Sequence, residues 1–356
     1  MHSFSKTLLL TAGAFALASC SSTTKTPETA KIVVPADKFD LSHWKITLPT
    51  DLNKDGKIDE VSVKNMQRFT HPYFFTLNAS NEMVFTVPNK AITSANSTNT
   101  RSELRQMPRG KNTNIKTHSA KNNFGIASNP KAKIIGGKLN ASLKVNHVAK
   151  RAGHPNKRPA YSVVVGQIHA TKDKSIVAEG KGFGYGNEPI KIYYKKWPNH
   201  DRGSVFWNYE RNLAKKNKDR TDIAYPVWGN TWENPTAPGD AGIALGEEFS
   251  YEINVHDDIM YLTFETANQK TVKYEINLAN NVDANGNVDS KDNAKGYEGD
   301  FLYFKAGAYN QCSTKDTAGD WYTACPGTGD WKTDRANGDF TSVAFTKLTL
   351  SDSTQP

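Results

Sequence analysis

The chain has 356 residues and a formal net charge of +9 at pH 7, and 37% of its residues are hydrophobic. A mean hydropathy of -0.63 excludes a polytopic membrane protein, and a content of 23% charged and 10% aromatic residues is typical of a folded chain. Because Lys and Arg outnumber Asp and Glu by 45 to 36, we expect an anionic partner or surface.

The N-terminal residues have the layout of a secretory signal, with Lys6 before an apolar run that ends in small residues. Residues 17–20 (LASC) resemble the bacterial lipobox, in which the Cys is lipidated and becomes the first mature residue. We therefore expect residues 1–19 to be a lipoprotein signal peptide and Cys20 to carry the lipid; an ordinary cleaved signal with an incidental Cys is the alternative. Ser21 lacks the acidic signal for inner-membrane retention, so the expected location is a bacterial cell envelope, with a lipid anchor in the outer membrane.

The segment 20–36 is rich in Ser, Thr and Pro and has no period, which predicts a flexible tether after the lipid. From residue 37 to residue 353 the sequence contains no second linker, internal repeat or low-complexity stretch. We therefore expect one large domain, present as a monomer and in contact with the membrane only through its lipid.

The stretch Asp51–Asp59 has carboxylates and an Asn at calcium-loop spacing, with a Gly at the sixth place. Ser62 stands at the twelfth place, where an EF-hand carries a bidentate Glu. An Asx-rich turn is therefore favoured over a structural calcium site. The sequence has no zinc signature and no phosphate loop, so we expect no metal and no required cofactor.

Most of the remaining chain predicts strands, because Tyr251–Val255 and Val272–Ile276 alternate apolar with polar residues. Further β-rich runs are 83–87, 161–169, 190–195, 204–209, 260–264, 301–309 and 343–350, and turn signals include Asn285-Gly286 and Asn337-Gly338. A helix is expected only at residues 211–218. Many short strands with polar turns predict an all-β fold, a jelly-roll β-sandwich with one concave sheet that forms a groove.

Three strand-like segments carry polar side chains, and the first is residues 101–105 (RSELR). In an extended chain Arg101, Glu103 and Arg105 share one face because strand side chains alternate. Each guanidinium can bind a sugar carboxylate through two hydrogen bonds, and Glu103 neutralises part of their charge. A salt-bridged surface strand is the alternative.

The second segment, residues 161–169, is an apolar strand that ends with Gln167 and His169 on one face. A neutral His in a groove can act as a base because its pKa lies close to working pH. A capped strand end with a hydrogen-bonded His is the alternative.

The third segment places five residues on one face of a strand: Tyr303, Lys305, Gly307, Tyr309 and Gln311. Gly307 is expected to leave room for a ligand to approach the backbone. A solvated outer strand explains Lys305 well, but it explains Tyr303 and Tyr309 less well.

With Cys20 assigned to the lipid, Cys312 and Cys325 remain. They bracket a short loop in a chain that leaves the reducing cytosol, so we expect a disulfide, with two free thiols as the alternative. Closing a loop of this length contributes roughly 3 kcal/mol to stability.

Together RSELR, QIH and YFKAGAYNQ resemble the signature motifs of the alginate lyases of polysaccharide lyase family 7. Residues 39–49 (FDLSHWKITLP) and 191–198 (KIYYKKWP) are also similar to that family, and the resemblance covers about residues 37–352. It implies a β-jelly roll and activity on alginate, a polymer of mannuronate and guluronate with one carboxylate per sugar. The expected partner is therefore an anionic polysaccharide, and no nucleic acid is expected.

Lyases cut by β-elimination: a base removes the C5 proton, an acid protonates the leaving O4, and a 4,5-unsaturated uronate remains at the new non-reducing end. The resemblance implies that Arg101 and Gln167 bind the sugar carboxylate as donors, which is usually the largest catalytic contribution. It implies His169 as base and Tyr309 as acid, with Tyr309 in both roles when the two protons lie on one side of the ring. Expected substrate-binding residues are Glu103, Arg105, Tyr303, Lys305 and Gln311. The Ile of QIH implies a preference for guluronate-containing blocks.

Two other functions fit parts of the sequence. A lipid-anchored, lectin-like protein that binds alginate without cutting it would keep the groove and the positive charge, but would not need His169 and Tyr309 together. A glycoside hydrolase needs two carboxyl groups facing each other across the bond, and the three motifs offer Glu103 alone.

Overall fold

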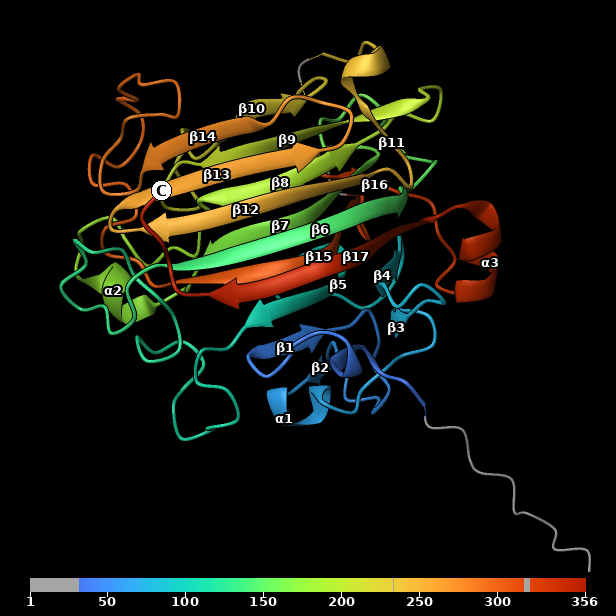
Figure 1. Ribbon diagram of the computed structural model, residues 1–356, viewed down its shortest axis with the longest axis horizontal. Helices are drawn as coiled ribbons and strands as arrows, with labels where there is room; N and C mark the ends of the chain where they lie inside the picture. Colours follow the sequence, from blue (N-terminus) through green and yellow to red (C-terminus); the bar gives the residue numbers. More distant parts are fainter. Residues whose placement is uncertain (1–31, 233, 317–320) are drawn as a thin grey trace, which may run out of the picture. The chain divides into compact units, whose positions relative to one another are not determined.

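Two β-sheets packed face to face make up the structure (Figure 1). The computed structural model describes residues 32–232, 234–316 and 321–356. The expected signal peptide, the lipidated Cys20 and most of the expected tether lie outside these residues, and Val33–Pro356 form one unit. The domain boundaries at 37 and 353 stay predictions. Within the described residues, no helix is long and apolar enough to cross a membrane.

The first sheet has ten strands among the described residues, and the order of its main path is β10-β9-β8-β7-β15-β5-β1-β2. These strands are β10 (Asp222–Trp228), β9 (Arg202–Glu210), β8 (Ile190–Lys195), β7 (Ser162–Ala170), β15 (Leu302–Ser313), β5 (Asn99–Gln106), β1 (Trp44–Thr47) and β2 (Glu60–Val61). Beside this path, β11 (Ile243–Ala244) pairs with β9, and β16 (Thr323–Ala324) runs parallel to β15. The pairs along the path itself are antiparallel.

The second sheet has seven antiparallel strands within the same described ranges, in the order β14-β13-β12-β6-β17-β4-β3. They are β14 (Val272–Asn277), β13 (Ile259–Thr266), β12 (Glu248–His256), β6 (Gly137–His147), β17 (Phe340–Ser351), β4 (Met83–Pro88) and β3 (Phe75–Leu77). Short helices lie between strands: η1 (Pro35–Asp37), α1 (Val63–Met66), α2 (Lys174–Ala178), η2 (Gly239–Ala241) and α3 (Trp331–Asn337). This architecture confirms the prediction of an all-β sandwich.

Side chains that alternate along the strands fill the space between the two sheets. In β15, Phe304, Ala306 and Ala308 belong to the main buried apolar cluster. From the second sheet, Phe85 and Phe345 pack edge to face, with 5.4 Å between their ring centroids. Burying each such large apolar side chain contributes about 1.5–3 kcal/mol. The alternate residues of β15 therefore lie on the opposite face of the first sheet, away from the core.

The prediction of a helix at residues 211–218 is wrong. Asn212 Nδ2 donates to the carbonyl oxygen of Gly296 at 2.8 Å and to Asp300 Oδ2 at 2.6 Å, and its backbone N–H donates to Asp292 Oδ1 at 2.7 Å. These buried hydrogen bonds hold the segment as a loop. The segment has no apolar stripe that a helix could bury against the sheets.

Candidate active site

The three polar segments lie on neighbouring strands, because β15 pairs with β7 on one side and with β5 on the other (Figure 1). On one side Tyr309 is opposite Arg101 and Lys305 is opposite Arg105. On the other side, the opposing pairs are Lys305 with Gln167 and Tyr303 with His169. Directly opposed residues in antiparallel strands project from the same face, so the structure gathers the predicted side chains on one face of the first sheet.

Glu103 lies at the centre of this cluster and is only 2% exposed. Its carboxylate accepts a hydrogen bond from Arg101 Nη1 at 3.2 Å. Lys305 Nζ and Gln167 Nε2 also donate to it. Two cations therefore share one carboxylate, and the cluster keeps a positive charge that a uronate can neutralise.

The Tyr309 ring lies under the guanidinium of Arg101, whose Cζ is 4.0 Å from the ring centroid. Ser97 Oγ connects the two groups, since it is 3.3 Å from the Tyr309 hydroxyl and accepts from Arg101 Nη2 at 3.1 Å. Lys305 Nζ is 5.9 Å from the same ring centroid. Burial lowers the pKa of Lys305 to about 8, although Glu103 opposes the change. The phenol of Tyr309 thus stands beside two cations.

The His169 ring has protein contacts at both of its nitrogens and on one of its faces. Nδ1 lies 2.6 Å from the carbonyl oxygen of Ala170, and Nε2 lies 3.2 Å from Glu188 Oε1. The ring stacks on Tyr303, with 5.3 Å between centroids and planes 9° apart. Burial lowers the pKa of His169, and Lys305 lowers it further, whereas Glu188 raises it. The imidazole is therefore mostly neutral at neutral pH, as a base must be.

Arg105 and Gln311 are turned towards the protein itself. Arg105 donates from Nη2 to Asn123 Oδ1 at 2.7 Å and to the Thr117 carbonyl oxygen at 3.2 Å. Its Cζ lies 3.9 Å from the ring centroid of Tyr303. Gln311 is 1% exposed, and its Nε2 donates to the Tyr309 carbonyl oxygen at 3.2 Å. Both residues stabilise the neighbourhood of the site in this structure, and their assignment to substrate binding stays a prediction.

The expectation that Gly307 leaves room for a ligand is wrong. A Cβ atom at this position would lie 2.6 Å from the carbonyl oxygen of Ser102 and 2.9 Å from Cα of Glu103. The backbone of β5 therefore fills the space. Gly307 also has φ of 138°, which side-chain-bearing residues rarely adopt. The pairing of β15 with β7 shifts register between Ala306 and Tyr309, and such irregularities re-aim the side chains beside them.

Sequence reasoning missed Glu188 and Ser97. Glu188 lies in the loop just before β8, and Ser97 lies in the loop before β5. Neither belongs to a strand with a readable alternation, so only the folded chain shows that they contact His169 and Tyr309. A polar residue in a loop gives no signal of its own in a single sequence.

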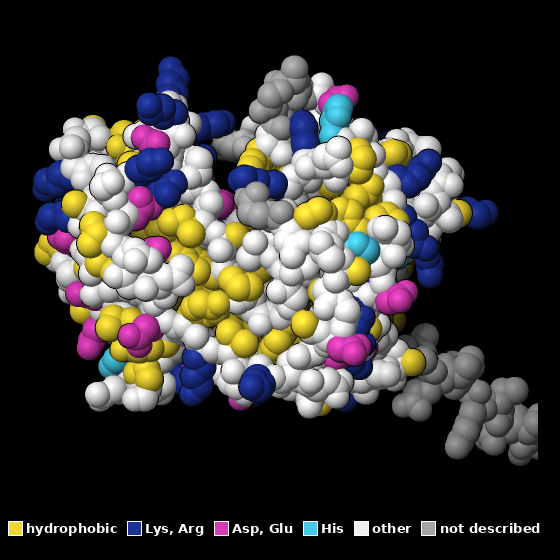
Figure 2. All heavy atoms as spheres, turned by 90° about the horizontal axis from the view of Figure 1, so that it is seen from above, with side chains coloured by type: hydrophobic (Ala, Val, Ile, Leu, Met, Phe, Trp, Pro, Cys, Tyr) yellow, Lys and Arg dark blue, Asp and Glu magenta, His cyan; other side chains and the backbone are white. Residues whose placement is uncertain are grey.

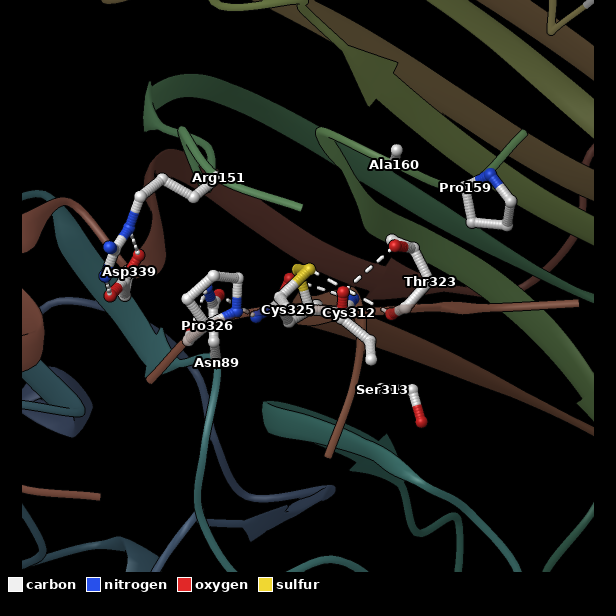
Figure 3. Close-up of a disulfide and its surroundings, with 12 residues drawn as sticks. Asn89, Arg151, Pro159, Ala160, Cys312, Ser313, Thr323, Cys325, Pro326 and Asp339 are labelled. Carbon is white, nitrogen blue, oxygen red and sulfur yellow. Dashed lines mark hydrogen bonds and ion pairs between the residues drawn. A yellow bond between two sulfur atoms is a disulfide. The ribbon is translucent and has the colours of Figure 1, made fainter. Parts of the chain in front are cut away.

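Cys312 and Cys325 form the predicted disulfide, with 5.3 Å between their Cα atoms (Figure 3). The bond ties the end of β15 to the segment that carries Tyr322. Burial raises the pKa of Tyr322 well above its ordinary value, and Tyr309 raises it further, which places the two phenols near each other. On the far side of the disulfide, Asn89 Nδ2 donates to the Pro326 carbonyl oxygen at 2.9 Å. The disulfide therefore fixes one flank of the site.

In the loop at residues 51–59, carboxylate oxygens accept backbone N–H groups. Asp51 accepts from Asp55 at 3.0 Å and from Gly56 at 3.0 Å, and Asp59 accepts from Leu52 at 2.9 Å. This pattern is that of an Asx-rich turn. Among the described residues, no group of three or more His, Cys, Asp or Glu side chains is arranged to hold a metal ion.

Figure 2 shows the molecule from the side on which β10 and β14 lie. In this view, Lys and Arg side chains gather on the raised region at the upper left (Figure 2). Such a distribution of cations attracts a polyanion to the surface.

Known proteins resemble this chain over nearly all of its described length. Residues 39–352 match the sequence family described as alginate lyase. An alginate lyase from Klebsiella pneumoniae is 36% identical over 299 residues, which is 81% of this chain and 88% of that relative.

Solved structures of alginate lyases share the fold, including the following two. The alginate lyase from Klebsiella pneumoniae superposes with a TM-score of 0.68 at 31% identity, and the match covers 91% of this chain and 100% of that one. The exolytic PL7 alginate lyase from Zobellia galactanivorans gives a TM-score of 0.72 at 35% identity, over 91% of this chain and 99% of that one. Sequence and fold therefore agree on one group of relatives.

Proposed function

Because the chain belongs to the alginate lyases of polysaccharide lyase family 7, we propose that its reaction takes place where β5, β15 and β7 meet. The protein is a polysaccharide lyase that acts on alginate, and the proposal concerns which residues do the chemistry. Its four reacting side chains are Arg101, Gln167, His169 and Tyr309. The observation that carries this assignment is the shared carboxylate of Glu103, which leaves a net positive charge beside an imidazole and a phenol.

The first requirement of the reaction is to neutralise the uronate carboxylate, because the C5 carbanion would otherwise form next to an existing negative charge. Arg101 and Gln167 are assigned to this task. Among the described residues, Arg101 Nε has no hydrogen-bond partner, and Gln167 Nε2 uses only one of its two hydrogens on Glu103. Both side chains therefore keep hydrogen-bonding capacity for the substrate. Donors fixed in place before the charge develops are the most effective stabilisers of an enolate-like intermediate.

His169 and Tyr309 are the proposed proton-moving groups. The C5–H bond breaks, its electron pair forms the C4–C5 double bond, and the C4–O4 bond breaks. The C5 proton passes to Nε2 of His169, and the hydroxyl of Tyr309 protonates O4. When the two protons lie on one side of the sugar ring, Tyr309 takes both roles: its phenolate removes the C5 proton, and the phenol so formed protonates O4. Lys305 is a charged neighbour of both groups, so the sugar would lie over the cations between them.

We also propose a preference for guluronate-containing blocks. It rests on the Ile in QIH, which is Ile168 here. Its side chain is fully buried in the core between the sheets, so it would act on the sugar only through the position of its neighbours, Gln167 and His169.

The proposal includes the cell envelope as the place of action, with residues 1–19 removed and Cys20 lipidated. Several acyl chains on one residue, each contributing about 0.8 kcal/mol per buried methylene, would hold the enzyme on a membrane. The enzyme is proposed to need no metal or organic cofactor and to work as a monomer.

The test is ultraviolet absorbance from the new C4–C5 double bond during incubation with poly-guluronate, poly-mannuronate and mixed alginate. We expect absorbance to rise with all substrates that contain guluronate, and fastest with poly-guluronate. A hydrolase would release reducing ends without absorbance, and a non-catalytic binding protein would produce neither.

A further inference from the structure

Glu188 contacts Nε2 of His169, the nitrogen to which the proposed function assigns the C5 proton. Its Oε1 is 3.2 Å from Nε2, and the side chains of Glu188 and His169 are 18% and 24% exposed. The other ring nitrogen, Nδ1, lies 2.6 Å from the Ala170 carbonyl oxygen. The ring therefore has protein partners at both nitrogens while one of its faces stacks on Tyr303.

These partners determine where the protons of His169 lie. A backbone carbonyl can only accept a hydrogen bond, so Nδ1 carries a hydrogen. Nε2 then has one lone pair, and its contact with the Glu188 carboxylate is attractive when a proton lies between the two atoms. Nε2 is also the nitrogen that would take the C5 proton. Glu188 thus stands against the atom that changes its protonation during the reaction.

Contacts with Lys191 and His169 keep Glu188 ionised. Lys191 Nζ lies 3.3 Å from Glu188 Oε2, and the Glu188 backbone N–H donates to Glu210 Oε2 at 2.9 Å. Burial raises the pKa of Glu210 well above its usual range, and the charge of Glu188 raises it further. Burial acts on Glu188 in the same direction, but Lys191 and His169 outweigh it and hold the pKa of Glu188 well below its ordinary value. Glu188 is therefore held as a carboxylate beside His169.

The charged groups that face His169 come from three parts of the first sheet. Lys305 of β15 and Arg101 of β5 disfavour the imidazolium, as burial does, and Glu188 before β8 favours it. Tyr303 covers one ring face with an uncharged phenol. Among the described residues, Glu188 is the anion that contacts the ring and opposes the two cations.

We propose that Glu188 is a positioning residue of the lyase reaction, which stabilises and orients the His169 imidazolium formed when Nε2 takes the C5 proton. The ionised carboxylate has no hydrogen to give the lone pair of the neutral ring, so that lone pair stays available to the substrate. Once the C5 proton has arrived, Glu188 accepts a hydrogen bond from the new Nε2–H. This inference rests on the proposed role of His169 as base.

The test uses Glu188→Gln, which keeps a side chain able to hydrogen-bond but removes the charge. Nuclear magnetic resonance of the imidazole signals, assigned with His169→Ala, should show the pKa of His169 lower by roughly one to three units. The acid limb of the kcat/KM profile on alginate should move to lower pH by the same amount. Glu60→Gln is the matched control, because Glu60 pairs with Lys45 at 2.7 Å and does not contact His169; both measurements should stay at the wild-type values.

Glu188→Asp retains the charge on a shorter side chain, so we expect an unshifted acid limb with a lower kcat. An unchanged His169 pKa in folded Glu188→Gln would overturn the inference. If that variant does not fold, Glu188→Asp decides, and a full kcat there would overturn the inference instead. The resonance measurement needs no turnover, so an inactive wild-type protein would refute the proposed function and would leave the pKa comparison able to test Glu188.

Discussion

The carboxylate of Glu103 accepts hydrogen bonds from three site residues, Arg101, Lys305 and Gln167. With 2% of its surface exposed, it has little area left for a sugar. Its contacts in this structure therefore hold the cationic side chains in place. The direct contact with substrate that the sequence suggested stays a prediction. Glu103 fixes the positions of Arg101 and Lys305, and its single negative charge neutralises only one of their two positive charges.

Replacing Glu103 by Gln should destabilise the fold and lower activity, because it leaves Arg101 and Lys305 buried without their counter-charge. We expect the free energy of unfolding to fall by about 3 kcal/mol, as for other broken buried ion pairs, which urea denaturation followed by circular dichroism measures. Glu60→Gln at the half-exposed pair with Lys45 is the control and should change stability by less than about 0.5 kcal/mol. Equal stability of the two variants would contradict the central position given to Glu103.

The pH dependence of kcat/KM should be bell-shaped. His169 must be neutral to act as base, and its pKa is lowered from 6.5, so activity should rise with pH through a midpoint below 6.5. Lys305 must be charged, and its pKa is about 8, so activity should fall as pH rises through that value. Lys305→Arg keeps the charge at high pH and should remove the alkaline limb. An alkaline limb that persists in this variant would assign it to another group.

His169→Ala and Tyr309→Phe should each lower the rate of double-bond formation by about 10²-fold or more, the usual effect of losing a general acid or base. Circular dichroism should show that both variants remain folded, since neither side chain lies in the core between the sheets. If either variant kept close to the full rate, the role assigned to that residue would be wrong.

At the scale of residues, the sequence predicts which side chains share one face of a strand, because side chains alternate along it. Arg101 and Glu103 were expected on one face, as were Gln167 and His169, and the structure places them so. The sequence could not reveal that Glu188 contacts His169, because that contact joins a loop to a strand and depends on the register of β7 with β8.

At the scale of elements, every run predicted as a strand matches an observed one, although Tyr161 and Phe301 lie one residue before β7 and β15. The larger errors lie elsewhere. Strand β6 alternates buried and half-buried residues over Gly137–His147, and was still missed. Its polar residues and the Gly before it weaken the β signal, so the pairing of β6 with β12 and β17 decides the conformation. The expected helix at 211–218 failed for a related reason, since its buried polar side chains bind distant backbone groups.

The disulfide between Cys312 and Cys325 joins β15 to the segment after it, and the effect of its removal can be measured directly. It closes a loop with a sequence separation of 13, so the double variant Cys312→Ser/Cys325→Ser should lose roughly 3 kcal/mol of unfolding free energy. The loop carries Tyr322 beside Tyr309, so kcat should fall as well. Reduction of the wild-type protein by dithiothreitol should reproduce both effects, and unchanged stability and kcat on reduction would show that the loop is held without the bond.

At the scale of the whole molecule, a net charge of +9 meets a substrate with one negative charge per sugar. Raising the ionic strength from about 0.1 M to about 1 M shortens the Debye length from about 10 Å to about 3 Å and screens this attraction. We therefore expect KM for alginate to rise several-fold while kcat changes little, because the contacts at Glu103 are buried. A trisaccharide substrate, with fewer charges, should show a weaker dependence. A KM for the polymer that is independent of salt would show that long-range attraction contributes nothing.

The most direct measurement is a crystal structure of Tyr309→Phe, the variant expected to bind without cutting, soaked with a guluronate oligosaccharide. We predict that the carboxylate of one sugar accepts hydrogen bonds from Arg101 and Gln167, with its C5 hydrogen facing Nε2 of His169 and its O4 facing residue 309. A sugar bound with its carboxylate away from Arg101, or with C5 out of reach of both residues, would contradict the account.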